Sequence, residues 1–416
     1  MNKFIDKLIS SSFTLLLVIS LFAGCHNTDV VSAEDNDFEP IVLTTEQEAM
    51  VETGNQFAFD LLRCIYQNHD ESFVASPFSL QCILGMLLNG GAPEVIEEIT
   101  TILGFDKNDI AGVNQYLGRM ILELPSRDKL TKVLSSRALY YRAGLTLKST
   151  YEETISTYYP AQVEEASFAK PSLLRERINN WCTKETNGMI VEILTPADDN
   201  MLVDAVVVLL DALWFKGVWK APFDKSKSEK ELFHGVDGHN RKMVFMKMKT
   251  NMLGLFQSSR YSSLDMPFGN GAYSMRIILP NKGESLQSIL NESELSLLPT
   301  IHHEPAMVDA WIPRFEMETT LECNEVLKKM GMEKSFGVDA FTEMLEQDFT
   351  LKFIRQKASI KIDETGTEAA AVTVATGSFI APPPLPQPVE FHADHPFIYL
   401  ITEKSTGAIL FAGIYQ

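Results

Sequence analysis

The chain has 416 residues, of which 45% are hydrophobic and 22% are charged, a composition ordinary for a globular protein with a sizeable core. Its formal net charge of −19 disfavours the basic surface that a phosphate backbone requires, so we predict no nucleic-acid partner. No Pro-, Gly- or Ser-rich linker interrupts the chain before residue 382, which predicts one large domain.

The first 24 residues have the layout of a secretory signal, in which two lysines precede an apolar run over residues 13–22. This run is too short to span a bilayer as a permanent helix. Ala23 and Gly24, directly before Cys25, resemble the lipobox of bacterial lipoproteins, whose cysteine is acylated. We therefore predict an exported protein that a lipid at Cys25 anchors to a bacterial membrane, the expected site being an outer membrane, facing the periplasm or the cell surface. An ordinary secretory signal is the alternative.

An acidic stretch follows the signal. Residues 25–42 carry five Asp or Glu and no Lys or Arg, a composition typical of a flexible, self-repelling tether. The folded domain is therefore predicted over residues 43–416. Its first helix is indicated by Thr45-x-x-Glu48, which has the spacing of a capping box, and by apolar residues at helical spacing from 57 to 65.

Later segments indicate both helices and strands. Apolar stripes predict helices around residues 83–87 and 96–103. Residues 205–215 are apolar without alternation, apart from Asp211, which is typical of a central strand covered on both faces. Near the C-terminus, residues 397–402 and 408–415 flank a polar turn and predict a β-hairpin. Helices dominate the first part and strands the later part, so we predict an α+β fold with a large mixed sheet.

Sequence motifs of common enzyme sites are absent: there is no GxSxG, HExxH, P-loop or GxGxxG. We interpret the histidine-containing segments 392–395 and 302–304 as a solvent-facing turn and a surface loop, and we expect no catalytic residue, cofactor or metal. Four cysteines lie among apolar residues and form no CxxC pair, so buried free thiols are predicted. They are Cys64, Cys82, Cys182 and Cys323.

The most informative segment is 363–381, which combines β-branched residues with many small ones. Alternate residues of a strand lie on opposite faces, and here one face would be entirely small and uncharged. That face consists of Thr367, Ala369, Ala371, Thr373, Ala375 and Gly377. Gly366 near the start of the segment and five prolines after its end are nevertheless typical of a loop. A loop with the composition of a central strand is a local contradiction, and such contradictions tend to mark function. A plain edge strand is the alternative.

Several segments, in order along the chain, together resemble the serpin family over about residues 43 to 416. Residues 364–371 look like the hinge of that family, and residues 391–397 with 411–413 look like its C-terminal signature. Residues 75–79 are similar to the segment at the opening of the main sheet, and residues 214–219 to the strand that separates there.

The resemblance implies the serpin fold, with an exposed reactive-centre loop at residues 366–390, and it implies inhibition of proteases rather than catalysis. A target protease cuts the loop and forms an acyl-enzyme, and insertion of the cut loop into the main sheet traps it in a covalent complex. We expect such proteases as partners and a monomeric chain. A non-inhibitory binding protein of the serpin fold is the alternative.

The same resemblance implies the site residues. The reactive bond is expected at Ile380-Ala381, suiting elastase-like proteases. Phe379-Ile380 is a second usable bond that suits chymotrypsin-like or subtilisin-like ones, because Pro382 lacks a backbone N–H. The hinge comprises Glu364, Gly366, Thr367, Glu368, Ala369, Ala370 and Ala371.

At the sheet opening the resemblance places Ser76, Ser79 and Gln356, with Asn179 as their partner. Two residues depart from the usual family pattern: Asp211 stands where Asn is usual, and Gln356 where many members have His. Both departures concern the rate of loop insertion rather than the fold.

Overall fold

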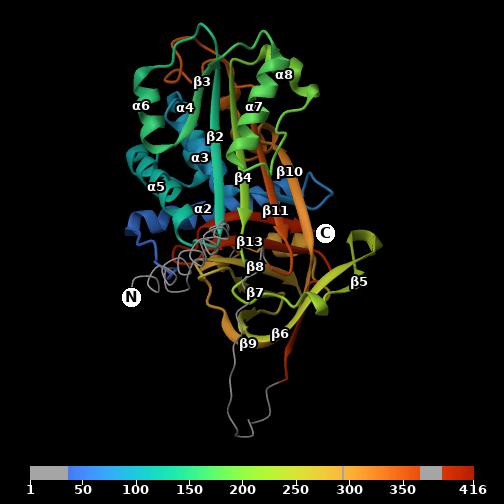
Figure 1. The fold of residues 1–416 in the computed structure, drawn as a ribbon. Coiled ribbons are helices and arrows are strands. Elements are labelled where there is room, and N and C mark those ends of the chain that lie inside the picture. Colours follow the sequence, from blue (N-terminus) through green and yellow to red (C-terminus); the bar gives the residue numbers. More distant parts are fainter. Residues whose placement is uncertain (1–35, 293–294, 366–386) are drawn as a thin grey trace, which may run out of the picture. The chain divides into compact units, whose positions relative to one another are not determined.

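The computed structural model describes residues 36–292, 295–365 and 387–416, and Figure 1 shows how their helices and strands are arranged. The helices are α2 (Thr45–Tyr66), α3 (Pro77–Leu88), α4 (Pro93–Leu103), α5 (Ile110–Glu123), α6 (Ser149–Tyr158), α7 (Pro171–Glu185), α8 (Asp199–Asp204), α9 (Leu286–Leu290) and α10 (Cys323–Lys329). The strands are β1 (Phe73–Ala75), β2 (Lys132–Arg142), β3 (Ala161–Ala166), β4 (Val207–Lys216), β5 (Glu229–Phe233), β6 (Arg241–Gln257), β7 (Tyr261–Pro267), β8 (Tyr273–Pro280), β9 (Glu304–Pro313), β10 (Phe315–Glu322), β11 (Ile354–Ile362), β12 (Val389–His392), β13 (Phe397–Glu403) and β14 (Ile409–Tyr415).

The folded unit begins earlier than the sequence indicates, because it runs from Phe38 to Gln416. Ile41 is buried, and its backbone N–H donates to the Ser405 hydroxyl at 2.9 Å. An apolar side chain at residue 41 has a place in the core, so the last residues of the predicted tether, 38–42, belong to the fold.

The N-terminus of α2 also differs from the prediction. The N-cap is Thr44, and its partner in the capping box is Gln47 rather than Glu48. Each side chain accepts the backbone N–H of the other at 3.3 Å. Residues 44 and 45 are both threonines, and the capping box begins at the first of them, one residue earlier than predicted.

Among the described residues, one sheet has five strands in the order β10-β11-β4-β2-β3. Strand β10 is antiparallel to β11, β11 is parallel to β4, and β4 is antiparallel to β2. Strands β11 and β4 hydrogen-bond directly to each other over Ile354–Ile360 and Leu209–Phe215. No other described strand therefore lies between β4 and β11, the parallel pair at the centre of this sheet, and in this sense the sheet is closed.

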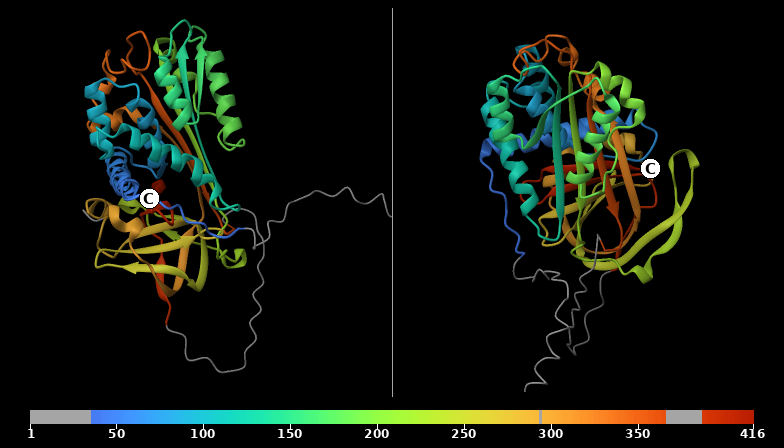
Figure 2. Two further views of the ribbon diagram at one scale, coloured as in Figure 1. Left: turned by 90° about the vertical axis from the view of Figure 1, so that its left-hand side faces the viewer. Right: turned by 45° about the horizontal axis from the view of Figure 1, so that its top comes forward.

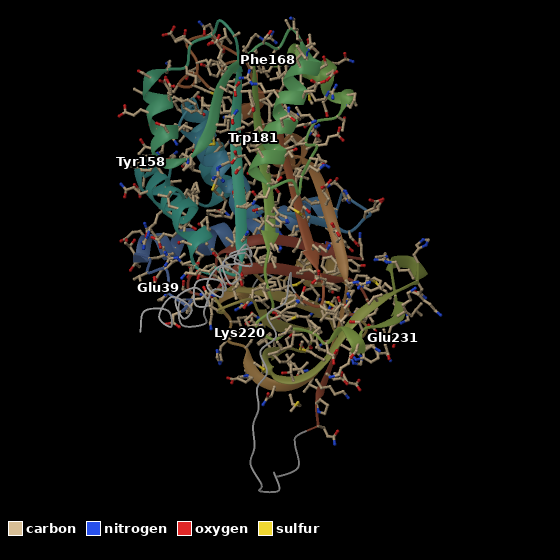
Figure 3. All side chains as sticks on the ribbon, in the orientation of Figure 1. Glu39, Tyr158, Phe168, Trp181, Lys220 and Glu231 are labelled. Atoms are coloured by element: carbon tan, nitrogen blue, oxygen red, sulfur yellow. The ribbon has the colours of Figure 1, made fainter. Side chains whose placement is uncertain are left out.

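Strand β4 confirms the prediction of a central strand covered on both faces. Its even-numbered residues Val208, Leu210 and Ala212 pack in one hydrophobic cluster with α7, and the odd-numbered Val207 and Leu209 pack in the main core. In the side view of Figure 2, α7 and α8 cover one face of the sheet, and α2 to α5 lie on the other. Phe168 and Trp181, labelled in Figure 3, belong to the cluster on the α7 side. Burial on both faces explains the missing alternation.

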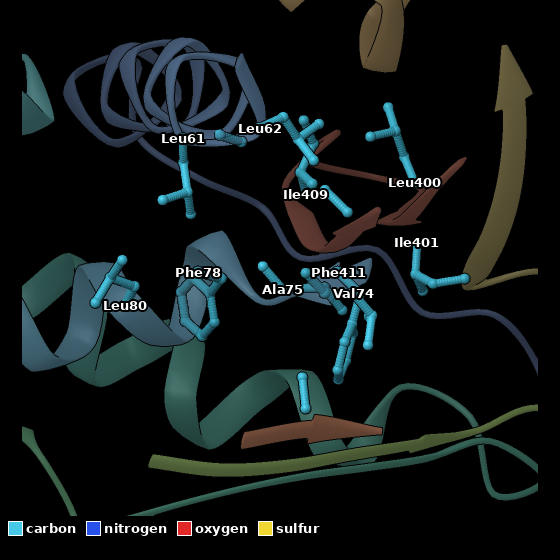
Figure 4. Close-up of a cluster of buried hydrophobic side chains, with 14 of the residues drawn as sticks. Leu61, Leu62, Val74, Ala75, Phe78, Leu80, Leu400, Ile401, Ile409 and Phe411 are labelled. Carbon is cyan, nitrogen blue, oxygen red and sulfur yellow. The ribbon is translucent and has the colours of Figure 1, made fainter. Parts of the chain in front are cut away.

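The second sheet has nine strands within the described residues, in the order β1-β14-β13-β8-β7-β6-β9-β12, with β5 paired to β6. The predicted C-terminal hairpin is confirmed as β13 and β14, which pair antiparallel. In Figure 4, Leu400, Ile401 and Phe411 of this hairpin gather with side chains of α2 and of the β1–α3 segment. This packing brings the start of α3 close to the C-terminal hairpin.

The described cysteines are free thiols, and three of them are buried, as predicted: Cys82, Cys182 and Cys323. Cys64 is only partly buried. Among the helices that the structure describes, none has both the length and the hydropathy that crossing a membrane requires.

Candidate functional site at the centre of the five-stranded sheet

Four buried polar residues meet where the parallel strands β4 and β11 adjoin the start of α3. Asp211 of β4 and Gln356 of β11 face each other in the strand register. Ser76 is the N-cap of α3, and Ser79 lies in its first turn. Capping places a serine at the helix start, and the register places the amide beside the carboxylate. The cluster thus joins the two central strands to the helix beneath them.

Hydrogen bonds connect all four residues, Ser76 through its backbone and the other three through their side chains. The Gln356 side chain accepts from the Ser76 backbone N–H at 2.8 Å and donates to the Ser76 carbonyl at 3.0 Å. It also donates to one Asp211 oxygen at 3.0 Å. The other Asp211 oxygen accepts from the Ser79 hydroxyl at 2.5 Å. Ser76, Ser79 and Gln356, which the sequence placed at the sheet opening, are therefore brought together with Asp211.

The environment of Asp211 disfavours the charged form of its carboxyl group. Complete burial raises its pKa to about 6, although the nearby Arg137 guanidinium and the hydrogen bonds from Ser79 and Gln356 oppose that rise. Arg137 lies opposite Asp211 on β2, is itself buried, and donates to the Ser135 hydroxyl at 2.7 Å. The sequence does not predict this role of Arg137, because nothing in the local pattern of β2 distinguishes a buried arginine from an exposed one.

The structure corrects the placement of Asn179. This residue lies on α7, and its side chain accepts the N–H groups of Ile193 and Leu194, both at 3.0 Å, and donates to the Leu194 carbonyl at 2.8 Å. These three hydrogen bonds hold the segment after α7. The partner of Gln356 at the sheet opening is Asp211, which stands directly beside it in the sheet.

The chain that leaves β11 is fastened to the chain that leaves β4. The Trp219 indole N–H donates to the Asp363 carbonyl at 2.8 Å, and the Trp219 backbone N–H donates to the Thr365 carbonyl at 3.2 Å. The Phe223 N–H donates to the carbonyl of Glu364, which is buried and pairs with Arg314 at 3.5 Å. The first predicted hinge residue, Glu364, therefore lies at the same end of the sheet as the end of β4.

Most of the predicted loop lies outside the described residues. Outside them lie the hinge residues Gly366, Thr367, Glu368, Ala369, Ala370 and Ala371 and the reactive-bond residues Phe379, Ile380 and Ala381. The predicted lipidation site, Cys25, also lies outside the described residues. The far end of the loop is described, and it is shorter than predicted. Val389 and Glu390 already belong to β12, where they pair with Val308 and Asp309 of β9.

Of residues 302–304, His302 and Glu304 are exposed, as a surface loop predicts, but the middle histidine is not, and residues 392–395 are less exposed than predicted. His303 is buried, and its ring lies 2.9 Å from the Ser263 hydroxyl. His395 contacts Asp394 and the Pro280 carbonyl, both at 2.9 Å. Each ring fills a place between strands that are distant in sequence, which local polarity does not reveal. In the described part of the chain, no three His, Cys, Asp or Glu side chains are grouped to hold a metal ion.

A family model described as serpin, serine protease inhibitor, matches residues 52–416. The match covers most of the chain, and the fold and the closed central sheet agree with it, so the chain belongs to the serpin family. Membership indicates protease inhibition as the general activity, with target proteases as the partners.

Three similar proteins illustrate the match. A serpin-like protein of Thermococcus kodakarensis is 28% identical over 394 residues, covering 93% of this chain and 90% of the relative. The solved structure of Arabidopsis AtSerpin1 in its native stressed conformation has a TM-score of 0.78 at 25% identity, covering 89% of this chain and 98% of that one. Human thyroxine-binding globulin complexed with thyroxine has a TM-score of 0.77 at 25% identity, with coverages of 89% and 98%.

Proposed function

We propose that the protein inhibits endopeptidases as a suicide substrate. A serine protease cleaves the segment between β11 and β12, the cut segment enters the five-stranded sheet between β11 and β4, and the acyl-enzyme is trapped before water releases it. The nucleophile belongs to the protease. This chain supplies the peptide bond that is cleaved and the free energy that loop insertion releases. The observation that carries the proposal is the closed parallel pair of β11 and β4 with the predicted hinge at its end.

Strand direction supports this route. The segment after Thr365 leaves the end of β11, so turning back beside β11 would make it antiparallel to that strand. Because β4 is parallel to β11, the same segment would also be antiparallel to β4. Insertion would thus replace one parallel pairing by two antiparallel ones, and antiparallel pairing is slightly more stable per residue. The gain in ladder hydrogen bonds gives the reaction its direction.

Composition supports the same step. The face of the segment that alternates from Thr367 to Gly377 is small and uncharged at all six positions, so it can enter a packed sheet without burying a charge. A non-inhibitory member is expected to carry a bulky or charged side chain on that face.

We further propose Ile380-Ala381 as the reactive bond, with Phe379-Ile380 as a second usable bond. The targets are then elastase-like, or chymotrypsin-like and subtilisin-like, serine proteases. Trypsin-like enzymes are expected to react poorly, since no Lys or Arg lies between Gly366 and Glu390. The prolines from Pro382 onward limit cleavage further along, because they lack the N–H that a protease draws on.

The decisive test mixes the full chain with an elastase-like or a chymotrypsin-like protease and runs a denaturing gel. We expect a covalent band at the summed mass of the two proteins less the C-terminal peptide that cleavage releases. Mass spectrometry of the released C-terminal peptide is expected to give a new N-terminus at Ala381 or Ile380. Cleavage without a covalent band would contradict inhibition, and an N-terminus beyond Pro382 would contradict the assigned bond.

A binding protein without inhibitory activity is the second candidate, and one observation favours it. A groove of about 560 Å³ lies between β6, β8 and the turn at residues 404–407, with Arg276 and Lys404 among the residues that line it. Grooves of this size can hold a small ligand. Thyroxine-binding globulin shows that the fold is compatible with a bound small molecule. The gel experiment separates the candidates, because a pure binding protein forms no covalent complex.

A further inference from the structure

The segment Glu192–Asp198, here called the latch segment, joins α7 to α8, and α8 is followed by β4. It lies against β11, although its own chain continues into β4. It therefore bridges the line along which these two strands have to part. The proposal developed below rests on the proposed function, since it concerns the rate of loop insertion.

Arg355 of β11 makes the main contact with the latch segment. Its guanidinium donates to both carboxylate oxygens of Asp198, at 2.7 and 2.8 Å, and to the Ile193 carbonyl at 3.1 Å. Both side chains are largely buried, with 7% and 11% of their side-chain surface exposed. Glu322 of the neighbouring strand β10 also pairs with Arg355. A two-pronged pair of this kind is directional and strong.

Other contacts fix the latch segment from both sides. Lys357, two residues further along β11, donates to the Glu192 carbonyl and pairs with Glu318. Asn179 of α7 holds Ile193 and Leu194 by their backbone groups. The Thr195 backbone N–H donates to Asp198 at 2.7 Å, which orients the carboxylate toward Arg355. The segment is thus held to β11 by side chains, to α7 by Asn179 and to β4 by the chain itself.

Electrostatics agree with a formed ion pair. Burial opposes ionisation of Asp198, yet hydrogen bonds from Arg355 and Thr195 outweigh it, so the pKa of Asp198 lies below its usual value. Burial likewise opposes the charge on Arg355, and Asp198 and Glu322 outweigh it, so its pKa is raised. Both partners are charged at neutral pH. Removing Arg355 would leave Asp198 buried without its counter-charge, whereas removing Asp198 would leave Arg355 with Glu322 alone.

Insertion of a strand changes the geometry that this pair requires. Neighbouring strands lie about 4.8 Å apart, so a strand placed between β4 and β11 raises their separation to roughly 9.6 Å. The latch segment is bound to α7, and α7 packs against β4, so the segment cannot keep contacts of 2.7 to 3.1 Å with β11 across such a shift unless it separates from α7. Its contacts with Asn179 of α7 oppose that movement.

We propose that Arg355 and Asp198 form a latch that holds the five-stranded sheet closed and slows loop insertion. The pair stabilises the uncleaved form selectively, because it is broken when the strand enters. Both are positioning residues: neither touches the protease or the reactive bond. A stronger latch would make opening of the sheet before cleavage rarer, and it would also make loop insertion after cleavage slower.

The test is a double-mutant cycle with Asp198→Asn and Arg355→Gln, measured by thermal unfolding of the full chain before and after cleavage within residues 366–390. We expect each single variant to lower the midpoint of the uncleaved form by a few degrees. Their coupling should be present in the uncleaved form and absent in the cleaved form. Loop insertion in the variants, monitored by the rate of covalent complex formation, should become about tenfold faster. A change of this size is within the range known for coupled charged pairs.

The matched control is the ion pair of Arg276 with Asp265 in the nine-stranded sheet, at 2.9 Å, tested as Arg276→Gln and Asp265→Asn. Its coupling should be equal in the two forms. Arg355→Lys, which keeps the charge and loses the two-pronged geometry, is the milder variant if Arg355→Gln does not fold, and Asp198→Asn is then paired with it. Equal Arg355–Asp198 coupling before and after cleavage would refute the latch and leave the inhibitor intact. Cleavage that does not raise the unfolding midpoint of the parent chain would instead refute insertion, and the latch with it.

Discussion

Asp211 illustrates how one side chain makes the closed sheet less stable than it could be. The carboxylate is fully buried, and its pKa is raised to about 6 from an ordinary value near 3.8. The folded form therefore binds a proton more tightly than the unfolded form. Between these two values stability falls as the pH rises, and above about pH 6 the loss is complete. A rise of about two pKa units corresponds to about 3 kcal/mol.

We predict that Asp211→Asn stabilises the uncleaved protein at pH 7.5, by up to about 3 kcal/mol, and that the gain shrinks toward pH 4. The reason is that asparagine is neutral, like the protonated acid, and keeps an oxygen for the Ser79 hydroxyl. It loses the oxygen that accepts from Gln356, so about 3 kcal/mol is an upper bound. Urea unfolding at a series of pH values measures the effect. Asp339→Asn, at an exposed position, is the control and should show no such trend. A gain that is constant with pH would contradict burial of the charge as the cause.

Strands β4 and β11 decide the function at the level of elements. In the proposed mechanism they are the partners between which the cut loop enters, and the polar cluster, the fastening at Trp219 just after β4 and the proposed latch all involve them. Each of these features stabilises the closed pair, and insertion has to break or move each of them. The barrier to insertion is therefore distributed along the strands rather than placed at one residue.

The hinge segment gives a prediction at the same level. We expect Thr367→Arg to turn the inhibitor into a substrate, because insertion would then bury an unpaired charge at a cost of several kcal/mol. The gel assay should show cleaved chain and no covalent complex. Glu368→Arg is the matched control: residue 368 has the opposite parity in a strand, where a charge is already present. Undiminished complex formation by Thr367→Arg would contradict insertion as the trapping step.

For the molecule as a whole, the proposed mechanism requires a folded form that persists by kinetics rather than by being the most stable state. The five-stranded sheet with its directly paired β4 and β11 is the form before insertion. In the proposed mechanism, the stored free energy is the difference in stability between this five-stranded sheet and the same sheet with one more antiparallel strand inserted. The unfolding comparison before and after cleavage, described above, measures that energy for the intact chain.

The proposed anchor is a property of the whole exported molecule. If Cys25 is acylated, Cys25→Ser should move the protein from the membrane fraction to the soluble fraction, since acyl chains supply about 0.8 kcal/mol per buried CH₂. Fractionation followed by immunoblotting measures the distribution. Cys64→Ser, at a partly buried position within the fold, is the control and should leave the distribution unchanged. Equal distributions for the parent and Cys25→Ser would indicate an ordinary secretory signal.

The sequence by itself determined the family, the central strand at residues 207–216 and the C-terminal hairpin, because these depend on local order: alternation, apolar runs and short motifs at fixed spacing. Tertiary structure alone decided which polar residues meet. Gln356 bonds to Ser76 across 280 residues and to Asp211 across 145, and Arg355 reaches Asp198 across 157. Asn179 was assigned to the wrong partners for the same reason. A side chain's partners follow from strand register and helix packing, and neither is written in its neighbours along the chain.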